Sequence, residues 1–168
     1  MLNANQQIHL DFLNIYKSAG LMCDNIIIEP ESKEYSACRF IINNKQAHFR
    51  VAKITPTKIG QFVTLWKRTA SGPIAPYDES DSIDLWIISV YSGNHFGQFI
   101  FPKSVLLKQG ILSKNGIGGK RAIRVYPPWD KAESKQATET QVWQLNYFLD
   151  LDPQNLNMQK IKALLLAA

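Results

Sequence analysis

Apolar residues change their spacing several times along the chain, so both helices and strands are expected. In residues 5–19, Ile8, Phe12 and Ile15 fall on one face at helical spacing, and Gly20 follows as a helix-stop signal. This pattern predicts an N-terminal amphipathic helix. Similar spacing and capping residues predict further helices over residues 55–66, 102–108, 138–149 and 156–166.

Strand-like runs that flank turn signals predict two β-hairpins. The first joins residues 34–42 to residues 46–54 through Asn43-Asn44-Lys45, and the second joins residues 85–91 to residues 96–101. Single strands are also expected over residues 25–29 and 120–126.

The order of these elements is helix, three strands, helix, strands and then helices, which predicts an α+β fold. We expect a mixed β-sheet built from the two hairpins and flanked by helices. A length of 168 residues is near the usual size of one domain, so residues 1–168 are expected to form a single domain. A composition of 45% hydrophobic and 20% charged residues is ordinary for a globular protein.

Composition argues against a membrane or secreted protein. The longest apolar stretches, residues 85–91 and 163–168, are far shorter than the ~20 residues that span a bilayer. The N-terminus lacks the basic and apolar regions of a secretory signal. Cys23 and Cys38 are the only cysteines and form no CxxC motif, so they favour a reducing compartment. A cytoplasmic protein that makes no contact with a membrane is therefore expected.

Positive charge is concentrated in two stretches that contain no acidic residue. One lies between Glu34 and Asp78 and the other between Asp84 and Asp130, and we call them the two acid-free windows. The net charge is +5. Such windows favour an anionic partner such as nucleic acid, whereas a solvated face that keeps the protein soluble is the alternative. Their basic residues include Arg39, Lys45, Arg50, Lys53, Lys58, Lys67 and Arg68 in the first window, and Lys103, Lys108, Lys114, Lys120, Arg121 and Arg124 in the second.

The first window contains a candidate phosphate site. Arg50, Lys53 and Lys58 lie within or beside the predicted turn from strand to helix, and Lys67 follows. Backbone N–H groups at such a turn, together with nearby cations, suit a phosphate group. The alternative is that Lys53 and Lys58 pair with acidic residues across the sheet. Those acids are Glu29, Glu31 and Glu34.

The second window interleaves cations with aromatic residues. Lys120, Arg121 and Arg124 precede Tyr126 and Trp129, a pattern that can follow a nucleic-acid backbone and stack on its bases. In the alternative, Trp129 covers the end of the sheet.

Motifs for common chemistries are absent from the sequence. There is no Walker-type phosphate loop, no GxSxG, no HExxH and no cysteine–histidine cluster with zinc spacing, so no cofactor is expected. His9, His48 and His95 are scattered along the chain. The carboxylates of Glu29, Glu31 and Glu34 are of the type that holds Mg²⁺.

Several blocks of the sequence are specific enough to indicate a family. They are Phe49-Arg50-x-Ala52-Lys53-x-Thr55-Pro56-x-Lys58-x-Gly60-x-Phe62-Val63 with Trp66-Lys67-Arg68, then Gly97-Gln98-Phe99-Ile100-Phe101-Pro102, Gly118-Gly119-Lys120-Arg121-Ala122-Ile123-Arg124-Val125-Tyr126-Pro127 and Trp143-Gln144. Together they resemble the signature of the MepB family over about residues 5–150. The resemblance implies a bacterial protein of a family with unsettled function, associated with a multidrug-efflux gene cluster.

A more distant similarity is to the PD-(D/E)XK nuclease scaffold, whose element order matches the predicted one and implies a restriction-endonuclease-like core. In that family an acid two residues before a lysine holds the metal. Here Lys53 is present, but Val51 stands where that acid belongs. The departure weighs against catalysis and leaves binding untouched, so we do not expect an enzyme.

The sequence indicates three candidate functions. The leading one is a nucleic-acid-binding protein, binding DNA or RNA, that contacts phosphates through a basic face. The second is a metal-dependent nuclease that uses some of Glu29, Glu31 and Glu34 with Lys53. The third is a protein that binds an anionic small molecule or a protein partner at the same basic surface. The residues predicted to contact nucleic acid are Arg50, Lys53, Lys58, Lys67, Arg68, Lys120, Arg121, Arg124 and Trp129.

Overall fold

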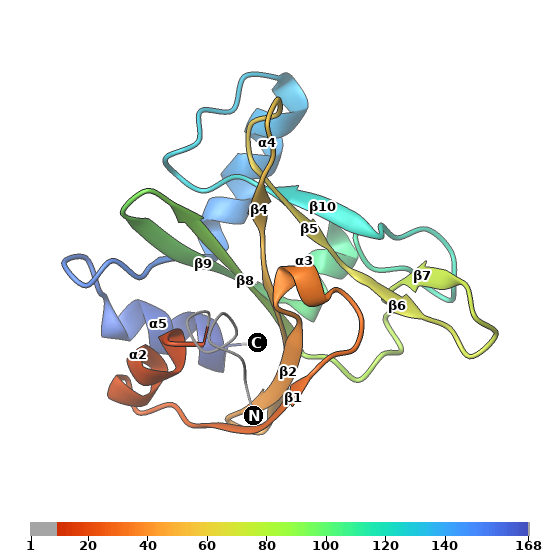
Figure 1. The fold of residues 1–168 in the computed structure, drawn as a ribbon, viewed down its shortest axis with the longest axis horizontal. Helices are drawn as coiled ribbons and strands as arrows, with labels where there is room; N and C mark the ends of the chain where they lie inside the picture. The colour runs from red at the N-terminus through yellow and green to blue at the C-terminus, as the bar shows by residue number, and fades with distance from the viewer. Residues whose placement is uncertain (1–9, 168) are drawn as a thin grey trace.

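The computed structural model describes residues 10–167, and its central feature is a six-stranded sheet (Figure 1). Strands β3 and β8 are parallel, with Ala47 opposite Leu85, and every other neighbouring pair in this sheet is antiparallel. The predicted mixed sheet and both predicted hairpins, β2–β3 and β8–β9, are therefore confirmed. In spatial order the strands are β1 (Cys23–Ile28), β2 (Cys38–Ile42), β3 (Lys45–Val51), β8 (Leu85–Ser92), β9 (His95–Pro102) and β11 (Phe148–Asp150).

Two helices cover one face of the six-stranded sheet. They are α2 (Phe12–Ser18) and α5 (Met158–Leu166), which lie on the same side of β8 and β9 in Figure 1. Phe12 stacks on Phe49 with ring centroids 4.8 Å apart, and Leu165 is fully buried in the same cluster. The predicted C-terminal helix is confirmed. The predicted N-terminal helix is confirmed from Phe12 onward, and its first part, residues 5–9, lies outside the described residues.

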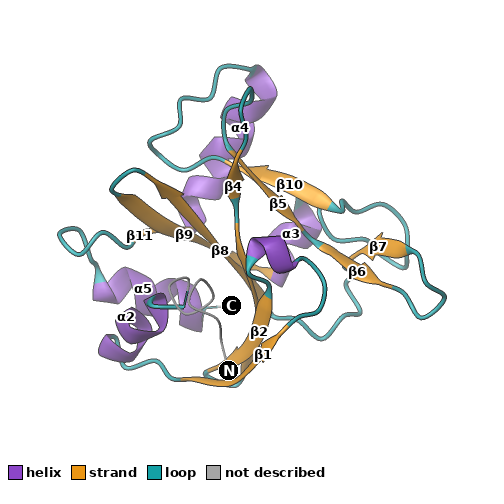
Figure 2. Cartoon of the chain, viewed as in Figure 1, coloured by secondary structure: helices purple, strands orange, loops and turns teal. Residues whose placement is uncertain are grey.

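A second, smaller sheet covers the opposite face (Figure 2). Val63, Ile123 and Val125 point from it into the core. The predicted short helix after Pro102 is confirmed as α3 (Lys103–Lys108), which buries Leu106 in the same cluster. No helix in the described part of the chain is long and apolar enough to cross a membrane. The small sheet has the order β10 (Ala122–Val125), β5 (Gln61–Thr64) and β4 (Lys53–Ile54), and a hairpin of β6 (Trp66–Arg68) and β7 (Ile74–Pro76) extends beside it.

The helix predicted over residues 55–66 is wrong. These residues form a turn and then strands β5 and β6, with Gln61, Val63 and Leu65 buried in alternation. Gln61 reaches inward because its side-chain amide donates to the carbonyl oxygen of Tyr91 at 3.0 Å. Because Gln61 is polar and yet buried, the apolar alternation that predicts a strand is interrupted here.

The helix predicted over residues 138–149 is only partly correct. Helix α4 (Lys135–Gln144) is followed by the 3₁₀ turn η2 (Leu145–Tyr147) and then by strand β11, where Phe148 pairs with Phe99 of β9. Val142 of α4 is apolar and yet 66% exposed. The pairing partner of β11 is distant in sequence, so local spacing could not indicate this strand.

Gly60 shapes the turn that joins β4 to β5. Its φ is +83°, and a Cβ at this position would lie 2.6 Å from Cε1 of Tyr126. The left-handed backbone and the close approach of the aromatic ring both require glycine. Gly60 therefore holds the β4–β5 turn against the end of β10.

We expect Gly60→Ala to destabilise the protein more than Gly20→Ala does. Gly20 has a similar φ of +81°, but a Cβ added there would meet no atom within 4 Å. It therefore shares the left-handed penalty of about 1–2 kcal/mol and lacks the clash. Chemical denaturation of both variants measures the difference. Equal losses of stability would show that Tyr126 does not constrain Gly60.

A charged cluster is buried where Glu29, the residue after β1, meets His48 and Arg50 of β3. Arg50 is 0% exposed and donates to Glu29 Oε2 at 2.9 Å and to the Tyr77 hydroxyl at 3.3 Å. Nδ1 of His48 lies 3.2 Å from the other carboxylate oxygen of Glu29. Burial, followed by the positive charges of Arg50 and Arg39, lowers the pKa of His48 from 6.5 to about 3. The imidazole is therefore neutral in the folded protein at neutral pH.

This pKa shift predicts an acid-sensitive contribution to stability. Between about pH 6.5 and pH 4 the unfolded chain binds a proton at His48 and the folded chain does not, so the free energy of unfolding falls as pH falls. The slope reaches about 1.4 kcal/mol per pH unit. His48→Gln should remove this slope, which denaturation at a series of pH values measures. Parallel pH profiles for the variant and the parent protein would contradict the prediction.

Candidate nucleic-acid interface

The two acid-free windows meet where β5 pairs with β10. In this antiparallel pair Phe62 lies opposite Arg124, and on the other side of β5 Phe62 lies opposite Lys53. Residues directly opposite in antiparallel strands point to the same face of a sheet. Lys53, Phe62 and Arg124 therefore form one row across the outer face of the small sheet, although they come from both windows.

Aromatic rings and hydrogen bonds hold the cations of this row. The Lys53 ammonium lies 4.7 Å from the centre of the Tyr35 ring, and the Arg124 guanidinium lies 5.8 Å from the centre of the Phe62 ring. Arg124 also donates to Thr55 Oγ1 at 2.8 Å and to the Gly60 carbonyl oxygen at 3.2 Å. The side chain of Arg124 is thus held over the outer face of the sheet by neutral groups.

A cavity of about 400 Å³ lies between β10 and α4, and we call it the β10–α4 cavity. Three cations line it, Lys58, Lys120 and Arg124, and none of the described residues in its lining carries a carboxylate. Aromatic and amide side chains complete its walls. These include Phe62, Tyr126, Trp143, Gln109, Gln136 and Gln144. Three cations in the lining of a cavity of this size suit an anionic ligand.

A buried carboxylate fixes the glycine-rich loop that leads to Lys120. Asp78 accepts hydrogen bonds from Ser113 Oγ at 2.6 Å and from the Gly116 amide at 3.0 Å, and Ser80 donates to its other oxygen. These bonds, led by the one from Ser113, hold the pKa of Asp78 well below its usual range. Asp78 therefore anchors the loop that leads to Lys120, and the sequence did not predict this role for it.

Some of the predicted contact residues are removed from the interface by their partners. Arg50 is fully buried against Glu29 and cannot reach a ligand, so this prediction is corrected. Lys67 donates to both carboxylate oxygens of Asp81, at 2.7 and 2.6 Å. Arg68 donates to Glu31 at 3.0 Å. These ion pairs neutralise the charges of Lys67 and Arg68.

Trp129 packs against other aromatic side chains, in keeping with the alternative that it covers the end of the sheet. Its ring stacks on His95 with centroids 4.8 Å apart and packs edge-on against Phe148 at 5.8 Å. It does not line the β10–α4 cavity.

Arg121 remains exposed one residue before β10, and its backbone carbonyl accepts a hydrogen bond from the Leu65 N–H that continues the β5–β10 pairing. Of the predicted residues, Lys53, Lys58, Lys120, Arg121 and Arg124 therefore lie on or beside the outer face of the small sheet and the cavity. We call these five the basic face.

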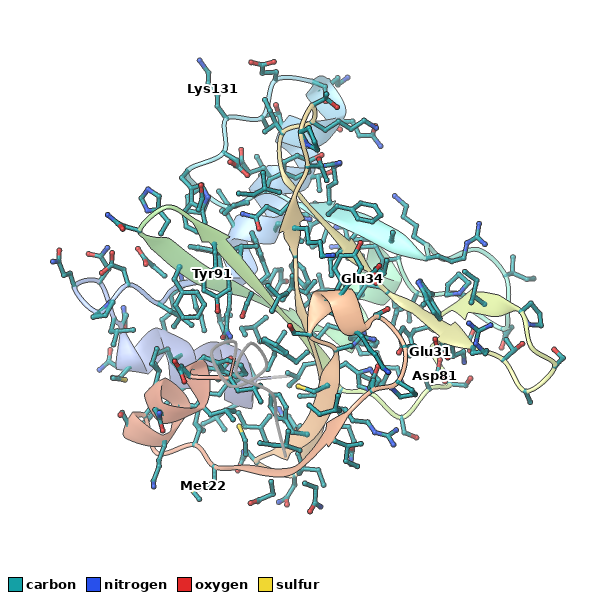
Figure 3. The ribbon with its side chains drawn as sticks, viewed as in Figure 1. Met22, Glu31, Glu34, Asp81, Tyr91 and Lys131 are labelled. Carbon is teal, nitrogen blue, oxygen red and sulfur yellow. The ribbon has the colours of Figure 1, made fainter. Side chains whose placement is uncertain are left out.

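The candidate metal ligands are already engaged or dispersed. Glu29 binds Arg50, and Glu31 lies beside β6, where it pairs with Arg68, near the Asp81 that pairs with Lys67 (Figure 3). Glu34 is exposed on the short 3₁₀ turn η1 (Lys33–Tyr35). Among residues 10–167, no group of three or more acidic, histidine or cysteine side chains is arranged to hold a metal ion.

Sequence reasoning missed the contribution of α4. Gln144 is buried, and its amide donates to the Arg124 carbonyl oxygen at 2.9 Å and accepts from the Tyr126 amide at 2.8 Å. Gln141, one turn earlier, donates to the carbonyl oxygens of Pro127 and Asp130. The spacing of these glutamines on one helix face was the available signal. The sequence does not indicate that Gln144 binds β10, because that contact depends on β10 lying at the edge of the small sheet.

Comparison with known proteins identifies the family. A structure described as the crystal structure of MepB matches with 33% sequence identity and a TM-score of 0.76, over 90% of this chain and 99% of that one. A bacterial homing endonuclease, I-Ssp6803I, matches with 12% identity and a TM-score of 0.44, over 84% of this chain and 87% of that one. No curated protein sequence matches the chain. The MepB-like family model matches residues 29–150, so the chain belongs to the MepB-like family.

Proposed function

We propose that this protein binds nucleic acid, DNA or RNA, in the cytoplasm, and that the basic face contacts the phosphates. The observation that supports this most is the convergence of cations from both acid-free windows around a cavity in which residues 10–167 place no carboxylate. Like charges repel one another, so such a cluster is most stable when an anion lies between its members. A phosphate backbone supplies those anions in a row.

The geometry also suits a polymer better than a single anion. Lys53 lies on the outer face of the small sheet, Arg124 lies on that face and also lines the cavity, and Lys58 and Lys120 line the cavity as well. The cations thus extend along a surface, as successive phosphates do. Phosphate contacts position a nucleic acid and carry no direct sequence information, so weak sequence preference is expected.

A metal-dependent nuclease receives less support from the same geometry. Glu29 and Glu31 are each bound by an arginine at 2.9 and 3.0 Å. Lys53 lies over Tyr35, and the chain carries Val51 where the nuclease resemblance would place an acid. Binding without cleavage is therefore the function that we propose.

Nucleic-acid affinity should fall steeply with salt, because each neutralised phosphate releases a counterion. If four or five cations make contact, the log–log slope should be roughly −3 to −5. Fluorescence anisotropy on single- and double-stranded DNA and RNA measures it. Absence of binding to all of these oligonucleotides at low salt would refute the proposed function.

Substitution of the exposed lysines tests which cations are involved. Lys58→Ala and Lys120→Ala should each weaken binding to all sequences alike and make the salt slope shallower by up to about one unit. Lys162→Ala is the matched control, because Lys162 is an exposed lysine on α5, behind the six-stranded sheet. A loss in the control as large as in the two variants would mean that charge in general, and not the basic face, supports binding.

A further inference from the structure

The edge of β10 is only partly covered by α4. β10 is an outer strand of the small sheet, so alternate residues along it turn their N–H and C=O groups away from β5. The side-chain amide of Gln144 fills one such position by bridging the Arg124 carbonyl and the Tyr126 N–H, at 2.9 and 2.8 Å. A single amide group therefore fits between the C=O of one residue and the N–H of the second residue after it.

The equivalent pair of backbone groups two residues earlier, the Ala122 C=O and the Arg124 N–H, is open to the cavity. The backbone carbonyl of Arg121 accepts a hydrogen bond from the Leu65 N–H. The backbone N–H and C=O groups of Ile123 and Val125 therefore also point toward β5, whereas those of Ala122 and Arg124 point toward the open edge. Ala122, Ile123 and Arg124 all line the β10–α4 cavity. Among the described residues, no side chain hydrogen-bonds the Ala122 carbonyl or the Arg124 N–H. This pair presents the same acceptor and donor that Gln144 bridges next to it.

We propose that the β10–α4 cavity takes one nucleotide unit, with the edge of its base between the Ala122 carbonyl and the Arg124 N–H. The Trp143 ring lines the same cavity and supplies an aromatic surface for the base, while Lys58 and Lys120 bind the phosphate. The inference rests on the proposed function for its phosphate contacts and adds a site for the base. The shared chemistry is an aromatic base that carries a phosphate, from a nucleic-acid chain or from a free nucleotide.

Several features favour a base over other amide-like groups. The volume of about 400 Å³ lies within the range of small-molecule sites, and the positively charged lining favours a ligand that carries phosphate. Every nucleobase places a hydrogen-bond donor beside an acceptor on its Watson–Crick edge, as the Gln144 amide does. The site should therefore accept all bases with little preference.

A comparison of normal and abasic oligonucleotides tests for the base site. The two probes carry the same number of phosphates, so contacts with the basic face are equal and only base contacts differ. We expect the full chain to bind the normal unpaired oligonucleotide at least about five-fold more tightly, as base–aromatic stacking implies. Free uridine monophosphate and ribose 5-phosphate form a second arm. Tighter binding of the former would add free nucleotides as a source of the ligand.

A cavity-filling variant locates the effect. Thr140 lies on α4 and lines the cavity, so Thr140→Phe should occupy the space of the base and leave every cation in place. Thr138→Phe is the matched control, because Thr138 is exposed on the same helix and does not line the cavity. We expect Thr140→Phe to bind normal and abasic oligonucleotides equally, with an unchanged salt slope. Thr138→Phe should keep the preference for the normal one.

The outcomes separate this inference from the proposed function. Equal, salt-dependent binding of normal and abasic oligonucleotides by the parent protein would leave phosphate binding intact and overturn the base site. A preference that persists in Thr140→Phe would place the base contact outside the cavity and also overturn it. Absence of binding to any oligonucleotide would refute the proposed function, and the inference would fall with it.

Discussion

Strand β8 is buried on both of its faces, and the need to cover both faces places the other elements. Leu85 and Ile87 pack toward α2 and α5, while Trp86 and Ile88 pack toward the small sheet and α3. Apolar surface of this extent must be removed from water on both sides. Helices can cover a sheet without exposing backbone groups, but a three-stranded sheet used as a cover has edges of its own. The edge formed by β10 is where the cavity lies, so the position of the candidate site follows from how the second face is covered.

The buried ion pair between Arg50 and Glu29 shows how the interior limits the choice of site residues. A guanidinium that is 0% exposed is stable only if a carboxylate and further hydrogen bonds replace its water. Glu29 serves that purpose together with Tyr77 and the Phe49 carbonyl. One contact therefore removes both a predicted phosphate ligand and a predicted metal ligand, because each neutralises the other.

Local pattern was sufficient for some elements and insufficient for others. The hairpins β2–β3 and β8–β9 were predicted because their turns and apolar runs are contiguous in sequence. Strand β5 was mistaken for a helix because Gln61 is polar yet buried, held by the distant Tyr91 carbonyl. For the site, the two acid-free windows were visible in sequence, and the acids that neutralise Lys67 and Arg68 were not, because Asp81 and Glu31 lie outside the first window. Burial and long-range pairing decided each of these cases, and neither is encoded in local spacing.

The open edge of β10 links the stability of the fold to its proposed binding. An exposed edge strand can pair with another chain, and proteins commonly guard such edges with a helix or with lysines. Here Gln144 on α4 covers one end, and Lys58 and Lys120 lie around the remainder. These cations would repel the same edge of a second copy and attract a phosphate. The charges that protect the strand from another strand are therefore the ones that favour an anionic ligand, so a single arrangement satisfies both requirements.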